Sequence, residues 1–185
     1  MRIIGGAFKG KKLFLPIDKM TRPLKDLVKE SIFNLIKHSK KINIDIEKSK
    51  ILDLFAGSGS FGLECLSRNA SKIVFLENYP QALKVLEKNI SLFPNGKCEV
   101  YNSNCFNFLS SDNILKDKFD IIFLDPPYKE LKINQIIENI LSKNLLNNNG
   151  FIIIHRHKKD TIKISQKLKI FETRLYGISK VYFGN

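Results

Sequence analysis

Four consecutive residues in the middle of the chain combine groups that could hold a planar amine. Asp125, Pro126, Pro127 and Tyr128 directly follow the apolar run 119–124. The Asp125 carboxylate and the Pro126 carbonyl are hydrogen-bond acceptors, and Tyr128 offers an aromatic face for stacking. Proline donates no backbone hydrogen bond, so the preceding strand must end here and the acceptors are held on a stiff turn. Two acceptors on the N–H bonds of a nucleobase amine would draw that poor nucleophile toward a tetrahedral geometry, and a stacking ring suits a base taken out of its helix.

A second group of chemically informative residues is a glycine loop followed by an acid. Gly57, Gly59 and Gly62 form a G-x-G-x-x-G pattern between a predicted strand and a predicted helix. Glycines at such a turn permit a tight bend and let a ligand lie against bare backbone. Glu77 ends the next predicted strand, where a carboxylate can accept hydrogen bonds from both hydroxyls of an adenosine ribose. The glycines could serve the turn alone, but the whole pattern predicts a nucleotide-like cofactor.

S-adenosylmethionine fits this pattern better than a nicotinamide cofactor, which needs a second half-domain that a chain of this length does not offer. Glu77 is predicted to hold the ribose and Asp53 to reach the methionine ammonium. Asn104 is predicted to accept from the adenine amine, and the backbone N–H of Cys105 to donate to its ring. The full predicted cofactor set is Asp53, Phe55, Ala56, Gly57, Gly59, Gly62, Glu77, Asn78, Asn104 and Cys105.

Methyl transfer from a sulfonium is an in-line displacement that the cofactor has already activated, so positioning should dominate catalysis. The predicted catalytic residues are Asp125, Pro126 and Tyr128. Asp125 would collect the proton that the amine loses, or pass it to water.

The helices and strands that must position these residues are predicted to form an α/β domain. Near-continuous apolar runs alternate with helical stretches, a pattern that predicts a mostly parallel, doubly wound sheet covered on both faces. Predicted strands are 51–56, 72–77, 98–102, 119–125 and 151–155, and predicted helices lie near 60–70, 80–93 and 133–143. The runs 169–178 and 179–185 have no room for a crossover helix and should form an antiparallel hairpin. The opening residues predict a β-hairpin. Apolar residues at 24, 27, 28, 32, 35 and 36 predict one face of a helix, with Thr21 and Pro23 as its start signals.

Composition indicates one domain, with residues 1–49 as a substrate-side extension and 50–185 as the core. The net charge is +13, divided as +8 over residues 1–50, −1 over 51–154 and +6 over 155–185. This distribution fits a nucleic-acid partner, or else a lysine-rich solvated surface. The predicted phosphate contacts are Arg2, Lys9, Lys11, Lys12, Arg22 and Lys25.

No apolar run approaches the roughly 20 residues of a membrane helix. The opening residues lack the long apolar stretch of a signal peptide. Three cysteines without C-x-x-C spacing predict neither a disulfide framework nor a metal site, which fits a reducing cytoplasm. His155 and His157 are interpreted as polar residues at a strand edge rather than metal ligands.

Over residues 50–155 the chain resembles S-adenosylmethionine-dependent amino-methyltransferases that share DPPY and the glycine loop. Over nearly its whole length it resembles the bacterial 16S ribosomal RNA guanine-N2 methyltransferases. The matching pieces are MRIIGGAFKGKKL, TRPLKDLVKESIFNLI, DLFAGSGSFGLE, DPPY and RLYGISKVYF. The resemblance implies a Rossmann-like class I methyltransferase fold and transfer to a guanine N2 amine of small-subunit ribosomal RNA. Asn104 stands where an aspartate is more usual, and Leu24 and Lys29 replace a threonine and an arginine, whereas Arg22 and Asp26 match.

Other functions stay open at this point. DPPY does not separate guanine N2 from adenine N6, so a DNA adenine-N6 methyltransferase is the alternative enzyme, although such enzymes usually carry a further domain to read duplex sequence. A non-catalytic RNA-binding or ribosome-assembly factor would need neither DPPY nor Glu77. A protein this small must grip RNA with its own domain surface, so the expected partner is ribosomal RNA within an assembled or partly assembled small subunit.

Overall fold

The computed structural model describes residues 1–17, 24–94, 96–111, 117–127 and 129–185. Two predicted site residues, Arg22 and Tyr128, lie outside this range, as do the helix start signals Thr21 and Pro23.

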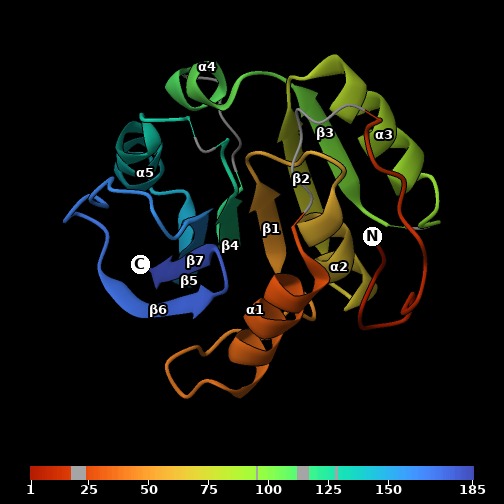
Figure 1. The fold of residues 1–185 in the computed structure, drawn as a ribbon, viewed down its shortest axis with the longest axis horizontal. Helices are drawn as coiled ribbons and strands as arrows, with labels where there is room; N and C mark the ends of the chain where they lie inside the picture. The colour runs from red at the N-terminus through yellow and green to blue at the C-terminus, as the bar shows by residue number, and fades with distance from the viewer. Residues whose placement is uncertain (18–23, 95, 112–116, 128) are drawn as a thin grey trace.

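One seven-stranded sheet organises the described chain (Figure 1), in the order β3-β2-β1-β4-β5-β7-β6. The first five strands pair in parallel, and β7 runs antiparallel to both β5 and β6. The strands are β1 (Lys50–Asp53), β2 (Lys72–Glu77), β3 (Cys98–Asn102), β4 (Phe119–Leu124), β5 (Leu146–His157), β6 (Ile170–Tyr176) and β7 (Ser179–Gly184). This arrangement confirms the predicted doubly wound sheet with a C-terminal antiparallel hairpin.

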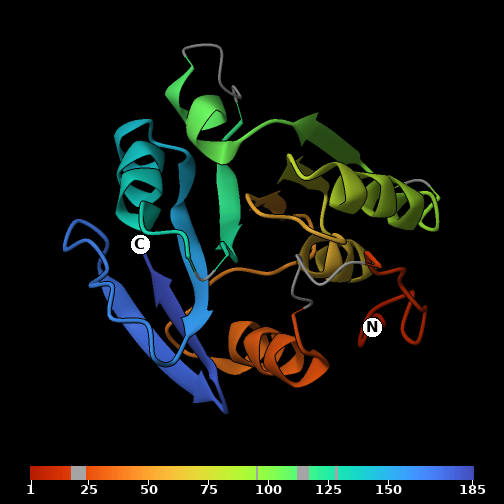
Figure 2. The same ribbon diagram turned by 45° about the horizontal axis from the view of Figure 1, so that its top comes forward.

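Helices cover both faces of the sheet, as Figure 2 shows. They are α1 (Asp26–His38), α2 (Ser60–Ser67), α3 (Pro80–Ile90), α4 (Cys105–Ser110) and α5 (Ile133–Ser142). Buried apolar residues of α1, α2 and α3 form one core with Ile51, Phe75 and Phe123. Those of α4 and α5 form a second core with Leu52 and Leu124. Neighbouring strand residues enter different cores because side chains alternate across a sheet. Within the described ranges, no helix is both long and apolar enough to cross a membrane.

The predicted N-terminal hairpin is present only as one antiparallel bridge, between Arg2 and Lys12. Residues 1–17 are here called the N-terminal arm. Some of their backbone N–H groups donate within the arm, as those of Ile3 and Leu13 do, and others donate to α2. The N–H of Ala7 donates to the Ser67 carbonyl at 2.7 Å, and that of Phe8 donates to the Ser67 hydroxyl at 2.9 Å. These groups are therefore unavailable for a regular strand ladder.

The core-facing side of α1 differs from the prediction at one residue and gains another. Leu27 is exposed, so its assignment to the apolar face was wrong. Lys29 is fully buried beside Val28, Ile32, Phe33 and Ile36. Because the helix begins at Asp26, its buried stripe passes through position 29, and a lysine occupies a place where a hydrophobic residue would be expected.

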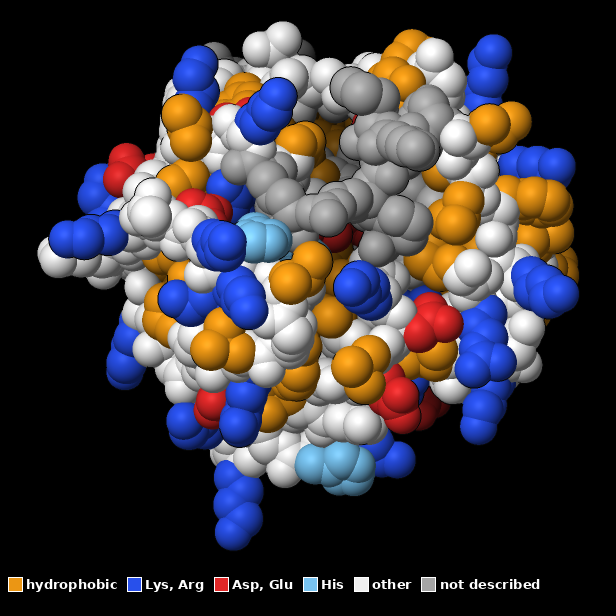
Figure 3. Space-filling view, in the orientation of Figure 1, with side chains coloured by type: hydrophobic (Ala, Val, Ile, Leu, Met, Phe, Trp, Pro, Cys, Tyr) orange, Lys and Arg blue, Asp and Glu red, His pale blue; other side chains and the backbone are white. Residues whose placement is uncertain are grey.

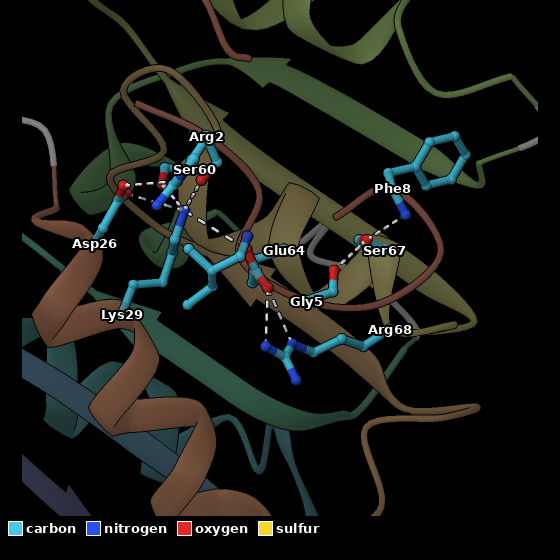
Figure 4. A network of polar contacts seen from close by, with 10 residues as sticks. Arg2, Gly5, Phe8, Asp26, Lys29, Ser60, Glu64, Ser67 and Arg68 are labelled. Carbon is cyan, nitrogen blue, oxygen red and sulfur yellow. Dashed lines mark hydrogen bonds and ion pairs between the residues drawn. The ribbon is translucent and has the colours of Figure 1, made fainter. Parts of the chain in front are cut away.

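Lys29 is accommodated by a network of polar groups that joins three parts of the chain (Figure 4). Its Nζ donates to the Arg2 carbonyl at 2.7 Å and lies 3.6 Å from Oε2 of Glu64, which is also fully buried. The other Glu64 oxygen pairs with Arg68 at 3.0 Å, and Oε2 also accepts from the N–H of Ile4 at 2.8 Å. Burial lowers the pKa of Lys29 from its ordinary value, and the charge of Glu64 opposes that shift. The network ties the N-terminal arm and α1 to α2.

Glu64→Gln should lower the free energy of unfolding by about 3 kcal/mol, because it leaves Lys29 buried with its main counter-charge removed. Urea denaturation followed by circular dichroism measures the change. Glu30→Gln is the matched control, since Glu30 is exposed on α1 and its substitution should be nearly neutral. Equal stability losses in the two variants would contradict the role assigned to the network.

Candidate functional site

Three carboxylates gather at the carboxyl edge of the sheet. Asp53 ends β1, Glu77 ends β2, and Asp125 directly follows β4. The sheet order reverses between β1 and β4, and crevices at such reversal points are where open α/β sheets bind ligands. The charges of Asp125 and Glu77 both act on Asp53, so the three acids share one electrostatic environment.

The glycine loop and Glu77 form one unit. Glu77 Oε2 accepts from the N–H of Gly57 at 2.7 Å, while Oε1 accepts from the N–H groups of Asn78 at 2.9 Å and Tyr79 at 2.8 Å. Gly57 has φ +54°, and a Cβ added there would meet nothing within 4 Å, so the loop backbone is open to a ligand. Glu77 therefore braces the loop and keeps acceptor capacity on Oε2.

Gly62 has a different purpose in the fold. A Cβ at this position would lie 2.3 Å from a ring carbon of Phe75 and 2.7 Å from Cγ2 of Ile73. The third glycine of the motif thus allows α2 to pack closely on β2, as expected for helix–strand contact in dinucleotide-type loops. A contact between Gly62 and the cofactor stays a prediction.

Asp53 is buried in a way that disfavours its charged form. It is 1% exposed, and its Oδ1 is buried with no hydrogen-bond partner among the described residues. Burial raises its pKa from 3.8 to about 8, and the neighbouring Asp125 and Glu77 charges raise it further, although a hydrogen bond to the Gly62 backbone opposes the shift. A buried carboxylate with a free oxygen is what a cationic ligand group would stabilise.

These features suit S-adenosylmethionine, which carries a sulfonium and an ammonium besides its ribose. Three convergent carboxylates favour the cations, and the open backbone at Gly57 leaves room beside them. Asn104 caps α4, its Oδ1 accepting from the N–H of Phe106 at 2.8 Å. The second lone pair of that oxygen remains for an adenine amine. The adenine contacts of Asn104 and Cys105 stay predictions.

The DPP turn is held by two consecutive residues of β5. Asp125 Oδ1 lies 2.7 Å from Nδ1 of His155. Arg156, 2% exposed, donates to the Pro127 carbonyl at 3.3 Å and the Glu130 carbonyl at 3.2 Å, and also pairs with Asp160. The interpretation of His155 as a polar strand-edge residue was wrong, because its side chain is buried and paired with the central acid of the turn. The available signal was a histidine directly after the apolar run of the strand predicted to follow the DPPY strand in sequence.

The basic residues proposed to contact RNA differ in their surroundings. Lys9, Lys12 and Lys25 are exposed, and Arg2 is exposed with an ion pair of 3.8 Å to Asp26. Lys11 instead donates to the Leu92 carbonyl and lies over the rings of Phe8 and Phe93. Its ammonium is already engaged within the protein. Figure 3 shows Lys and Arg side chains spread around the whole outline of one face, rather than in a single patch.

Within the described ranges, no three His, Cys, Asp or Glu residues gather as metal ligands.

Comparison with known proteins extends these observations. The family model described as "Conserved hypothetical protein 95" matches residues 1–185. Ribosomal RNA small subunit methyltransferase D of Haemophilus influenzae is 33% identical over 180 residues, which cover 96% of this chain and 90% of that protein. The protein of the same name from Escherichia coli K12 is 35% identical over 152 residues, covering 82% of this chain and 69% of that one. The solved structure of yhhF from Escherichia coli superposes with a TM-score of 0.83 at 27% identity, covering 100% of this chain and 96% of that one.

The strand order, and the likeness to the solved methyltransferase structure, show that the chain has a Rossmann-like α/β methyltransferase fold. Since the family model spans the full sequence, the chain belongs to the Conserved hypothetical protein 95 family.

Asp53→Asn should stabilise the ligand-free protein at pH 7 by an amount on the order of 4 kcal/mol. The folded state keeps a proton on Asp53 up to about pH 8, whereas the unfolded state loses it near pH 3.8. Wild-type stability therefore contains a penalty that is absent below pH 3.8 and grows as pH rises toward 8, and the asparagine variant lacks it. Urea denaturation at several pH values from 4 to 8 measures the difference.

Glu47→Gln, at an exposed carboxylate, is the control and should keep the wild-type pH profile. Parallel profiles for wild type and Asp53→Asn would show that Asp53 titrates normally.

Proposed function

We propose that this protein transfers a methyl group from S-adenosylmethionine to the exocyclic N2 amine of a guanine in small-subunit ribosomal RNA. The observation that carries the proposal is the meeting of three acids at the reversal point of the sheet: Asp53, whose Oδ1 has no partner among the described residues, Glu77, which braces the loop, and Asp125, which His155 anchors. Relatives named for methylation of small-subunit ribosomal RNA, similar over most of this chain, supply the substrate class.

The residues divide the work between holding the cofactor and orienting the acceptor. When bound, S-adenosylmethionine supplies a methyl group on a sulfonium, already activated for in-line displacement. Glu77 holds the ribose with Oε2, and Asp53 compensates the cationic methionine end. Asp125 accepts one N–H bond of the target amine and the Pro126 carbonyl accepts the other, so the nitrogen lone pair is directed away from both. After transfer, Asp125 takes the proton that the amine releases, while the N–H bonding electrons return to nitrogen.

The choice of guanine N2 rests on the resemblance of the N-terminal and C-terminal pieces to the guanine-N2 group. The alternative acceptor, adenine N6 of DNA, would use the same acceptor pair. A pure RNA-binding or assembly factor would not need a buried carboxyl group with an unsatisfied oxygen, as Asp53 has among the described residues, because burying such a group destabilises the ligand-free fold.

The RNA surface is assigned to the N-terminal arm and the adjoining end of α1. Lys9, Lys12 and Lys25 are exposed to solvent, and phosphate contacts from such side chains orient a complex without reading sequence. A second basic region borders a groove of about 780 Å³ between α1 and the β6–β7 hairpin. Arg174, Lys180 and Tyr176 line this groove. Because such contacts carry little sequence information, recognition should depend on the shape of a partly assembled subunit.

Asp125→Asn should weaken cofactor binding only slightly, because Asp53 and Glu77 remain, yet lose methyl transfer by about 100-fold or more, on the scale of a lost proton acceptor. The asparagine oxygen can still face His155, which turns an N–H donor rather than an acceptor toward the amine. The assay uses labelled cofactor and small-subunit particles from cells lacking the protein, followed by mapping of the methylated base. Asp120→Asn is the control, since Asp120 lies on the same strand but near its amino end.

Near-normal turnover of Asp125→Asn at saturating substrate would refute the acceptor role. Methylation that maps to adenine N6, or to no base in the particle, would refute the proposed substrate.

Replacing Lys9 and Lys12 together by glutamine should weaken particle binding and reduce the slope of log affinity against log salt by about 1–2, while leaving cofactor affinity intact. Lys11 is left in place because its ammonium is engaged within the protein. The control pair is Lys97 and Lys118, which are exposed at the amino edge of the sheet. Binding to particles and to naked RNA is measured at several salt concentrations. An unchanged slope would contradict the assignment of the RNA surface to the N-terminal arm and would favour the groove beside β6.

A further inference from the structure

The pairing of His155 with Asp125 is built into the sheet. In the register of β4 and β5, Leu124 lies opposite Ile154, so the next residue of each strand, Asp125 and His155, come side by side. The His155 side chain is 8% exposed and the Asp125 side chain 18%. A hydrogen bond in so dry a place is electrostatically stronger than it would be in water.

The direction of this hydrogen bond follows from its partners. An ionised carboxylate only accepts, so Nδ1 of His155 must carry the proton and donate it to Oδ1 of Asp125. In the neutral ring Nε2 is then an acceptor, and it is buried with no partner among the described residues. The imidazole makes its one described hydrogen bond to the acid of the DPP turn.

A free aspartate can exchange its two oxygens by rotating about its terminal torsion, which is broad and roughly two-fold. A hydrogen bond from Nδ1 to Oδ1 removes that symmetry and leaves Oδ2 as the oxygen that His155 does not hold. Arg156 fixes the backbone of the same turn through the Pro127 and Glu130 carbonyls. Side chain and backbone of the turn are thus held by adjacent residues of β5, which point to opposite faces of the sheet.

We propose that His155 is a positioning residue for methyl transfer, whose Nδ1–H holds Oδ1 of Asp125 so that Oδ2 alone meets the target amine. The inference rests on the proposed function, because it assigns Asp125 to the acceptor. It predicts that the donor at Nδ1 matters, rather than the ring or its charge.

Two variants separate the donor from the volume. His155→Asn keeps an N–H close to the position of Nδ1, whereas His155→Leu fills the site without a donor. In single-turnover assays with saturating cofactor and particles, His155→Asn should stay within about threefold of wild type and His155→Leu should lose about 100-fold, on the scale of a misplaced reacting group. Cofactor affinity by calorimetry and the concentration of particles at half-maximal rate should be unchanged in both.

The control is Lys118→Leu, at an exposed residue beside the amino end of β4, which should behave as wild type. Equal rates for the leucine and asparagine variants would overturn the proposal, as would a loss in His155→Leu that is matched by weakened cofactor or particle binding. An inactive wild type on every particle would instead contradict the proposed function.

A readout independent of activity tests the pair itself. Nitrogen NMR of imidazole-labelled protein should show Nδ1 of His155 protonated, and the signal should shift strongly in Asp125→Ala but not in Asp120→Asn. A ring protonated only at Nε2 would overturn the proposal whatever the assays show.

Discussion

The buried ion pair between Lys29 and Glu64 is the constraint on which the arrangement of the molecule depends. Glu64 lies on the helix that directly follows the glycine loop, and Lys29 lies on the helix that follows the N-terminal arm. Lys29 also reaches the Ser60 hydroxyl at 3.3 Å, in the first turn of α2. The elements expected to face the substrate and the element that shapes the cofactor loop therefore share one electrostatic anchor. Neither charge could be buried alone, because an unpaired ion in the interior is far less stable than the same ion in water.

At the carboxyl edge of the sheet the opposite principle holds. Asp53, Glu77 and Asp125 are three acids placed close together. No lysine or arginine among the described residues forms an ion pair with them. Glu77 and Asp125 are each held by hydrogen-bond donors, from backbone N–H groups and from His155, whereas Asp53 keeps an oxygen with no described partner. The fold tolerates this local instability because the rest of the two cores is closely packed, and a cationic ligand would remove it. Stability given up at a site in this way is typical of binding sites prepared before their ligand arrives.

Local patterns predicted most of the fold, and contacts between distant segments account for what they missed. Strands at 72–77 and 98–102 match β2 and β3 residue for residue. The continuous apolar run of β2 identifies a buried strand well, whereas β3 is only partly buried and was found from its short β-prone run. Helix α4 was missed because six residues carry too little periodicity, although Asn104 is a typical capping residue. Leu27 was assigned to the wrong face because no side chain caps the start of α1, so the sequence did not show where the helix begins. The roles of Lys29 and His155 depend on partners 35 and 30 positions away, which only the packing of α1 on α2 and the register of β4 with β5 could reveal.

The contacts of the N-terminal arm also determine the order in which the molecule can be completed during translation. Ile4 binds Glu64, Phe14 binds Asn89 and Lys11 binds the Leu92 carbonyl, across 60, 75 and 81 positions of sequence. A ribosome adding 5–20 residues each second needs roughly 4–16 s to supply the last of these partners. The residues of the arm thus leave the exit tunnel well before the partners that hold them in place have been made. Until then a basic, glycine-containing tail hangs free beside the ribosome, an assembly rich in the polyanion that its charge would attract.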